Sequence, residues 1–213
     1  MGLRSKNSLL SQKKILRHFD RQDPIMASLI RKIGPFKLKN NRRYFQVLCK
    51  AIIAQQISTS AARAITSRFM SLFNGRSATA KHILVLTNDT LREVGLSHQK
   101  ISYLKDLSKH FSEKLIRPHR LTYLSNEDVI QQLTTVRGIG RWTAEMFLIF
   151  SLNRLDVLPK DDVGLRIALK NIYKLKNNPP AKKILQLARS WHPYETVGTW
   201  YAWRSLEAEI TVY

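Results

Sequence analysis

The chain has 213 residues, enough for one large domain or two small lobes around a sizeable hydrophobic core. Its 36 Lys and Arg residues outnumber 15 Asp and Glu residues. The resulting net charge of +21 argues against an ordinary neutral metabolic enzyme and favours a polyanionic partner, either nucleic acid or an anionic membrane surface. The single cysteine, Cys49, excludes a disulfide framework, a cysteine-type zinc site and a four-cysteine iron–sulfur cluster within one chain.

Targeting and membrane signals are weak. The longest apolar run, Met146–Phe150, is far shorter than the roughly 20 residues of a membrane span, so we expect no membrane partner. Residues 1–19 are basic and free of acidic side chains, which is compatible with a transit peptide but favours a basic arm continuous with the fold. We therefore expect a cytoplasmic, nucleoid-associated protein in a prokaryote or a nuclear protein in a eukaryote.

Apolar residues recur at helical spacing along the whole chain, and no segment alternates with a period of two. This pattern predicts an all-α protein of ten to twelve short helices. In chain order, the predicted helices cover about residues 24–33, 45–53, 61–72, 87–95, 101–111, 125–133, 142–152, 163–172 and 184–191, with a last helix after Pro193.

Several helix ends carry capping residues. Asp23 followed by Pro24 predicts an N-cap and a first helical position, and Gly34 ends that helix. Ser125 with Asp128 predicts a capping pair. These positions give the predicted helices definite boundaries.

The most informative segment is Leu133–Phe150, in which two helices flank a short turn, Gly138-Ile139-Gly140. Glycines permit a tight turn with positive φ, and the amides that open the second helix, at residues 140–142, favour an anion. In so basic a protein, a DNA phosphate is the expected anion. The alternative is a plain helix–turn–helix corner in which glycine caps the first helix.

Five segments together carry a family resemblance over about residues 20–205. They are Ile52–Ser58 (IIAQQIS), Gly95–Lys100 (GLSHQK), Arg137–Glu145 (RGIGRWTAE), Leu158–Asp162 (LPKDD) and Trp191–Trp203 (WHPYETVGTWYAW). In this order and spacing the chain resembles the helix-hairpin-helix DNA glycosylases, specifically the alkylpurine or DNA-3-methyladenine glycosylase II branch.

The resemblance implies a single glycosylase domain over residues 1–213, built as a two-lobed helical bundle around the helix-hairpin-helix motif. We expect one lobe at about 41–150, ending in the hairpin, and a second from 1–40 plus 151–213. The implied activity is hydrolysis of the N-glycosidic bond of alkylated purines in duplex DNA, by a monomer. The competing hypotheses are a non-catalytic helix-hairpin-helix DNA-binding protein and a related glycosylase for oxidised or mismatched bases.

The resemblance also implies that Asp162 is catalytic. A fixed carboxylate beside the sugar can stabilise the oxocarbenium-like transition state and orient or deprotonate water. The alternative is that Asp161 and Asp162 only cap the helix at 163–172. We expect Asp161 to cap and Asp162 to react.

Aromatic residues are the candidate base pocket. Trp142 stands where bifunctional members of the superfamily carry a Schiff-base lysine, which implies a monofunctional hydrolase. The resemblance places Trp142 and Trp203 against the flipped base, with Tyr194 and Trp200 nearby in sequence. Core packing is the alternative for each of them.

The remaining implied sites concern the DNA strand. Gln56 matches the side chain that fills the gap left by the flipped base, and Gln55 is the alternative. Candidate backbone contacts are Gly138, Ile139, Gly140, Arg137, Arg141 and the basic residues of 37–43. The resemblance further implies no required cofactor, but a possible K⁺ or Na⁺ held by the backbone carbonyls of Thr134, Val136 and Ile139.

Overall fold

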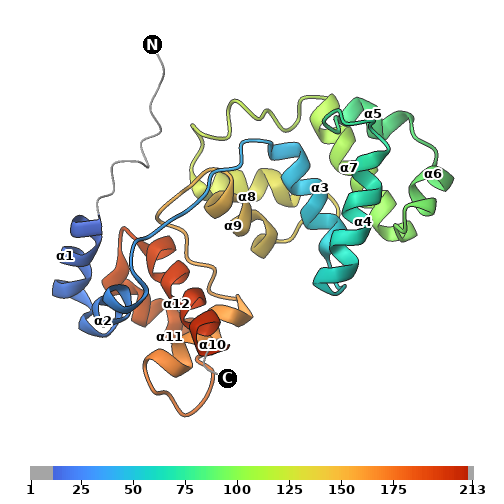
Figure 1. Ribbon diagram of the computed structural model, residues 1–213. Coiled ribbons are helices and arrows are strands. Elements are labelled where there is room, and N and C mark those ends of the chain that lie inside the picture. The colour runs from blue at the N-terminus through green and yellow to red at the C-terminus, as the bar shows by residue number, and fades with distance from the viewer. Residues whose placement is uncertain (1–11, 211–213) are drawn as a thin grey trace. The chain divides into compact units, whose positions relative to one another are not determined.

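The computed structural model describes residues 12–210, and side chains as far as residue 207. Within this range the chain forms twelve α-helices and one 3-10 helix, and it contains no strand (Figure 1). The predicted all-α class is confirmed. No helix in the described range is long and apolar enough to cross a membrane. The first part of the predicted basic arm, residues 1–11, lies outside the described residues.

The chain divides into two compact units, which we call the terminal unit (residues 1–39 and 153–213) and the central unit (residues 40–152). The described helices of the terminal unit are α1 (Gln12–Gln22), α2 (Pro24–Ile33), α10 (Val163–Ile172), α11 (Ala181–Leu187), the 3-10 helix η2 (Ala188–Trp191) and α12 (Glu195–Ile210). Those of the central unit are α3 (Tyr44–Ala54), α4 (Thr59–Ser71), α5 (Ala80–Val85), α6 (Asn88–Glu93), α7 (His98–Ser112), α8 (Asn126–Thr134) and α9 (Arg141–Phe150).

The predicted caps are present. Asp23 accepts a hydrogen bond from the amide of Met26 at the start of α2, with Pro24 at the first helical position. Ser125 and Asp128 form a reciprocal capping box at the start of α8. These local bonds satisfy amides that have no partner within the helix.

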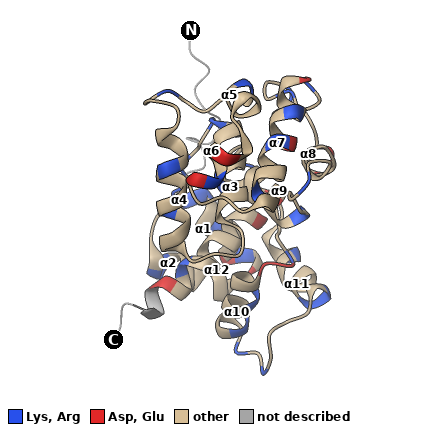
Figure 2. Ribbon diagram, turned by 90° about the vertical axis from the view of Figure 1, so that its right-hand side faces the viewer, with Lys and Arg blue, Asp and Glu red and all other residues tan. Residues whose placement is uncertain are grey.

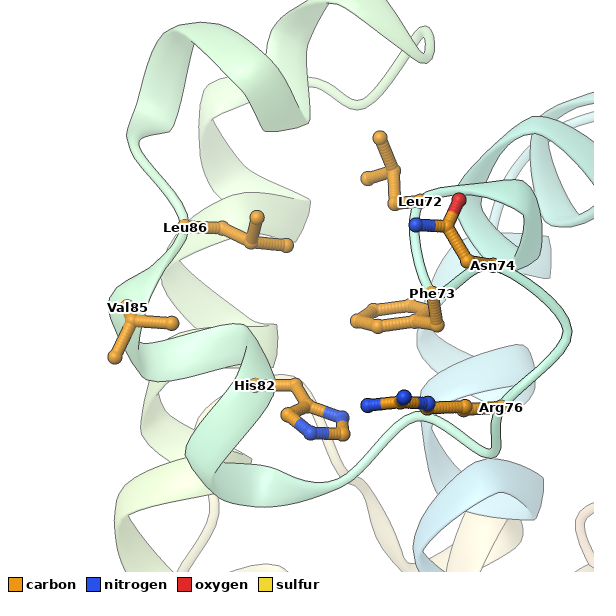
Figure 3. A pocket seen from close by; sticks show the side chains of 7 residues that line it. All are labelled: Leu72, Phe73, Asn74, Arg76, His82, Val85 and Leu86. Carbon is orange, nitrogen blue, oxygen red and sulfur yellow. The ribbon is translucent and has the colours of Figure 1, made fainter.

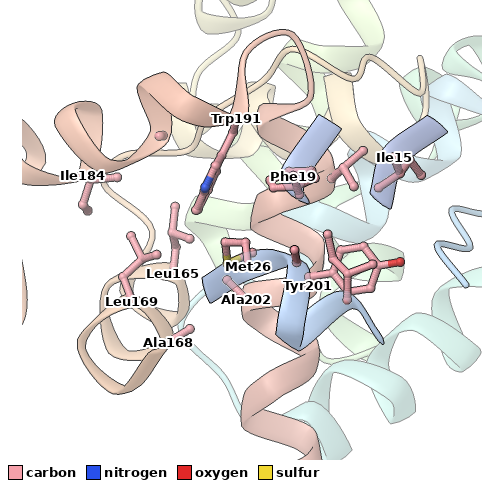
Figure 4. Packing of buried hydrophobic residues seen from close by; sticks show 14 residues of the cluster. Ile15, Phe19, Met26, Leu165, Ala168, Leu169, Ile184, Trp191, Tyr201 and Ala202 are labelled. Atoms are coloured by element: carbon pink, nitrogen blue, oxygen red, sulfur yellow. The ribbon is translucent and has the colours of Figure 1, made fainter. Parts of the chain in front are cut away.

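The hydrophobic core of the terminal unit joins residues from both ends of the chain (Figure 4). Ile15 and Phe19 of α1 pack with Met26 of α2 and with Trp191 and Tyr201 from the C-terminal segment, all fully buried. Because residues far apart in sequence share this core, α1 is an integral part of the unit.

In the central unit, α3 packs against α7. The apolar stripe of α3 is buried, and Phe45 meets Phe111 of α7 edge to face, with 5.0 Å between ring centroids. Cys49 lies within this stripe of α3, where burial raises the pKa of its thiol.

Two helices were not predicted. α1 has a short apolar stripe among basic residues, and its charge hid its amphipathic character. α5 spans only six residues, which is too short to establish a helical period. Both are stabilised by tertiary packing: Ile15 of α1 and Ile83 of α5 are fully buried.

Candidate functional site

The turn between α8 and α9 rests against α7. Gly138 has φ of +84°, and a Cβ atom at this position would lie 2.1 Å from the ring of Tyr103. Ile139 is buried. Glycine is therefore required at 138 by both backbone conformation and close packing. By contrast, Gly140 has an extended φ of −89°, so the expected positive φ applies only to the first glycine.

The N-terminus of α9 is open to a ligand. Gly140 is its N-cap and carries no side chain to accept from the first-turn amides, whereas Ser, Thr or Asp side chains cap the helices α2, α4, α5, α6, α7, α8 and α10. No atom lies within 4 Å of a Cβ placed on Gly140, apart from its chain neighbours. Free space, amide donors and the positive end of the helix dipole together suit an anion.

Arg141 holds the two hairpin helices together. Its guanidinium donates two hydrogen bonds to Glu127 of α8, at 3.0 and 2.8 Å, and a third to Glu145 of α9 at 3.2 Å. Hydrogen bonding to Arg141 lowers the pKa of Glu127. In the structure, the Arg141 guanidinium lies between two carboxylates; the phosphate contact suggested by the sequence stays a prediction.

Arg137 is the more accessible arginine of the turn. Its side chain is 64% exposed and lies 3.6 Å from Asp106 of α7. The backbone amide of Arg137 donates to the same carboxylate at 2.8 Å. Asp106 and Tyr103 therefore hold the turn on α7, a support that the sequence did not reveal although the two residues lie three apart on one helix.

The two glutamines that follow α3 have different environments. Gln55 is half-buried, and its side-chain amide donates to the carbonyl of Gly138 at 2.7 Å. Gln56 is exposed and has φ of +55°, a conformation that is uncommon for residues other than glycine. Gln55 thus ties this segment to the hairpin, and Gln56 presents its side chain to solvent.

Trp142 lies in the first turn of α9 and is 49% exposed. A large indole at the surface differs from the core packing that is usual for tryptophan. About half of the Trp142 side chain is therefore open to solvent.

The acidic pair at 161 and 162 differs from expectation. Asp162, not Asp161, is the N-cap of α10: its Oδ1 accepts from the amide of Leu165 at 2.6 Å. Asp161 instead forms ion pairs with Lys160 and Arg166 and is exposed. The predicted cap at Asp161 was wrong because capping geometry places the acceptor one residue before the first helical residue, which is Val163.

Asp162 also contacts Trp203. The indole Nε1 of Trp203 donates to Oδ1 of Asp162 at 2.8 Å, while Asp162 is only 8% exposed. A Cβ at Gly164 would lie 3.2 Å from this carboxylate and 3.4 Å from the indole ring, so the glycine leaves room for their approach. Capping and the indole bond hold the carboxylate in one orientation.

The other two candidate pocket aromatics have different neighbours. Tyr194 packs edge to face on His18 of α1, with 4.9 Å between centroids. Trp200 packs on Phe36 and Tyr201. Both contribute to the core of the terminal unit, as the packing alternative expected. Among the three aromatics predicted in this unit, Trp203 is the one bonded to Asp162.

The carbonyls suggested for a monovalent cation lie at the end of α8 and in the turn. Thr134 is the last residue of α8, and the carbonyl of Val136 accepts from the amide of Ile139 at 3.1 Å. Backbone oxygens at the negative end of a helix are suitable ligands for such an ion. Among the described residues, no three His, Cys, Asp or Glu side chains gather to hold a metal ion.

The central unit also contains a pocket of about 380 Å³ between the end of α4 and α5 (Figure 3). Phe73, Arg76 and His82 are among its lining residues, and the ring of Phe73 stacks on His82 with 5.9 Å between ring centroids. None of the residues predicted for DNA binding or catalysis lines this pocket.

The sequence was compared with the profiles of known protein families. Residues 49–193 match the profile of the HhH-GPD superfamily of base excision DNA repair proteins. The chain belongs to this superfamily. The matched region includes the hairpin, the segment at 55–56 and Asp162.

Relatives place this HhH-GPD protein in the alkylpurine branch. It is 34% identical to DNA-3-methyladenine glycosylase 1 of Schizosaccharomyces pombe over 88% of this chain and 85% of the relative. The crystal structure of a DNA-3-methyladenine glycosidase from Bacillus halodurans matches with a TM-score of 0.85 and 32% identity, over 97% of this chain and 94% of that one. A structure of the S. pombe enzyme with abasic DNA matches with a TM-score of 0.80 and 33% identity, over 91% and 97%.

Proposed function

We propose that this HhH-GPD protein is a monofunctional DNA glycosylase that hydrolyses the N-glycosidic bond of alkylated, 3-methyladenine-type purines in duplex DNA. The names of its relatives support this activity, and the buried, oriented carboxylate of Asp162 carries the proposal for this chain. The protein acts in base excision repair, as a monomer, in the cytoplasm or in the nucleus. Its partner is duplex DNA that contains alkylated bases.

Asp162 acts on the sugar. As the bond between C1′ and the base nitrogen breaks, positive charge develops on the sugar, and the carboxylate stabilises it. Water then adds to C1′ and loses a proton to the carboxylate or to solvent, which leaves a free base and an abasic site. An alkylated purine that is already cationic leaves as a neutral base, so no second acid is required.

The hairpin and the basic segment at residues 37–43 bind the DNA strand. The open N-terminus of α9, at Gly138 to Gly140, accepts a phosphate, and the exposed side chain of Arg137 contributes charge. Basic residues 37–43 add further contacts, since Lys37, Lys39, Arg42 and Arg43 are exposed. Figure 2 shows how strongly Lys and Arg outnumber acidic residues along the ribbon.

Different residues contact the flipped base and fill the gap that it leaves in the duplex. Gln56 enters the gap because it is exposed, while Gln55 is bonded to Gly138. We assign Trp142 and, separately, Trp203 to base recognition, because the electron-rich face of an indole attracts a cationic base. Tyr194 and Trp200 support the packing of the terminal unit.

A K⁺ or Na⁺ ion would be held by the carbonyls of Thr134, Val136 and Ile139. Its charge would strengthen the attraction of the hairpin for phosphate. The ion would not take part in bond cleavage.

The decisive test compares Asp162→Asn with Asp161→Asn on duplex DNA carrying methylated purines. Asparagine keeps an oxygen that can cap α10 but loses the charge, so base release falls by roughly 100-fold or more while duplex binding persists. Asp161→Asn is the matched control because Asp161 is exposed and pairs only at the surface. Equal base release by Asp162→Asn would remove the mechanism. Tight binding without any release by the wild type would favour the non-catalytic alternative.

A further inference from the structure

The segment that carries Gln56 is held from two sides within the central unit. α3 ends at Ala54, and the carbonyl of Ile53 accepts a hydrogen bond from Nζ of Lys100 at 2.7 Å. Lys100 belongs to the first turn of α7, and its partial burial lowers the pKa of its ammonium group. On the other side, the Gln55 amide donates to Gly138 at 2.7 Å.

The ammonium group has a clear electrostatic role here. The last carbonyls of a helix have no intrahelical partner and form the negative end of the helix dipole, which a cation complements. Many helices end with glycine in the left-handed conformation, but this one is followed by Gln55 and Gln56. Gln56 adopts the left-handed φ of +55° without glycine's freedom. A side chain from another helix therefore has to stabilise this end of α3.

We propose that Lys100 is a positioning residue for Gln56: its bond to the Ile53 carbonyl, together with the Gln55–Gly138 bond, sets the direction in which the Gln56 side chain enters DNA. This inference rests on the proposed function, in which Gln56 fills the gap left by the flipped base. It gives Lys100 a role in DNA insertion although its ammonium is directed to the protein backbone. The Gln55–Gly138 hydrogen bond also links the inserting segment directly to the phosphate-binding turn.

The test measures insertion without base release. A duplex carries a tetrahydrofuran abasic-site analogue opposite 2-aminopurine, whose fluorescence reports the environment of the opposite base. Lys100→Met removes the ammonium but keeps an unbranched side chain. We expect it to slow the fluorescence change by about tenfold, because a small misplacement of an aligned group is costly. Affinity for undamaged duplex should stay within about twofold, since the phosphate-binding turn is unchanged.

Lys105→Met is the matched control. Lys105 lies on the same helix and donates to the carbonyls of Leu84 and Leu86, at 3.0 and 2.5 Å, and its pKa is likewise lowered by burial. Its loss removes a comparable cap at a segment away from Gln56, so insertion should proceed at the wild-type rate. Lys100→Arg, which keeps a donor, should recover part of the lost rate. An equal slowing by both methionine variants would overturn the positioning role.

A double-mutant cycle identifies the residue through which Lys100 acts. Gln56→Ala alone should slow insertion, and Lys100→Met should add little in that background. A full additional effect would overturn the inference and leave the proposed function intact. If Gln56→Ala leaves insertion unchanged, the proposed insertion of Gln56 is itself wrong.

A second variant applies if Lys100→Met does not fold. Gln55→Leu removes the Gln55–Gly138 hydrogen bond, and normal insertion by that variant would contradict the proposal.

Discussion

At the scale of single residues, Asp162 combines two tasks that the sequence suggested for two residues. It caps α10, and it is also the residue that we propose acts on the sugar. The backbone amide of Leu165 and the indole of Trp203 both donate to Oδ1 of Asp162. The side chain is therefore held by residues that lie 3 and 41 positions further along the chain. Such support is how a reactive group is kept in a productive orientation.

Trp203→Phe isolates the contribution of the indole N–H. Phenylalanine keeps an aromatic ring but cannot donate to Asp162, so the single-turnover rate of base release should fall by about tenfold, the value of one hydrogen bond to a charged group. Trp200→Phe is the matched control because Trp200 packs on Phe36 and Tyr201. A rate unchanged in Trp203→Phe would show that the N-cap alone positions the carboxylate.

Trp142→Ala tests the recognition of charge. If the exposed indole attracts a cationic base, the variant should lose about 5- to 30-fold in kcat/KM on cationic alkylpurines and less on neutral ones. The measurement is the ratio of excision rates for a methylated purine and a neutral substrate such as hypoxanthine. A uniform loss would instead point to a role in packing.

At the scale of elements, α7 supports both segments that we propose contact DNA. Tyr103 and Asp106 hold the turn before α9, and Lys100 holds the end of α3. The two hairpin helices are joined by Arg141 through Glu127 and Glu145. Charged residues near the hairpin thus stabilise the element itself.

Gly138→Ala should destabilise this element. The added methyl group meets the Tyr103 ring, and alanine is strained at φ of +84°, so we expect the free energy of unfolding to fall by about 1–3 kcal/mol. Gly140→Ala is the control, since its φ is ordinary and the space around it is open. Thermal denaturation of both variants provides the comparison. Equal stability of the two would show that the ring of Tyr103 moves aside without cost.

At the scale of the whole molecule, the two ends of the chain are joined through Asp23. Its buried carboxylate caps α2 and accepts hydrogen bonds from Tyr173, Ser190 and Trp191, residues at least 150 positions away. Burial, followed by the nearby carboxylate, raises the pKa of Tyr173. The unit that carries Asp162 therefore depends on a long-range polar contact as well as on its hydrophobic core.

Asp23→Ala should lower the free energy of unfolding by about 2–4 kcal/mol, because it removes a cap and leaves buried donors without an acceptor. Asp20→Ala, which breaks only an exposed pair with Arg31, should change it by less than about 1 kcal/mol. Chemical denaturation measures both. A small effect at Asp23 would mean that water replaces the carboxylate at these donors.

The sequence by itself determined the helical class, most helix boundaries and the family, because helical periodicity, capping residues and the glycine turn are local features. The Asp23 and Ser125 caps follow from such patterns. Only the tertiary structure decided that α1 forms, that Asp162 is the cap, and that Arg141 faces two carboxylates. It also showed that Gln55 is the glutamine bonded to Gly138, and that Trp203 bonds to Asp162 whereas Trp200 packs on Phe36. The reason is physical. Each of these outcomes depends on which donor, acceptor or ring from a distant segment lies beside the residue, and local periodicity does not specify that neighbour.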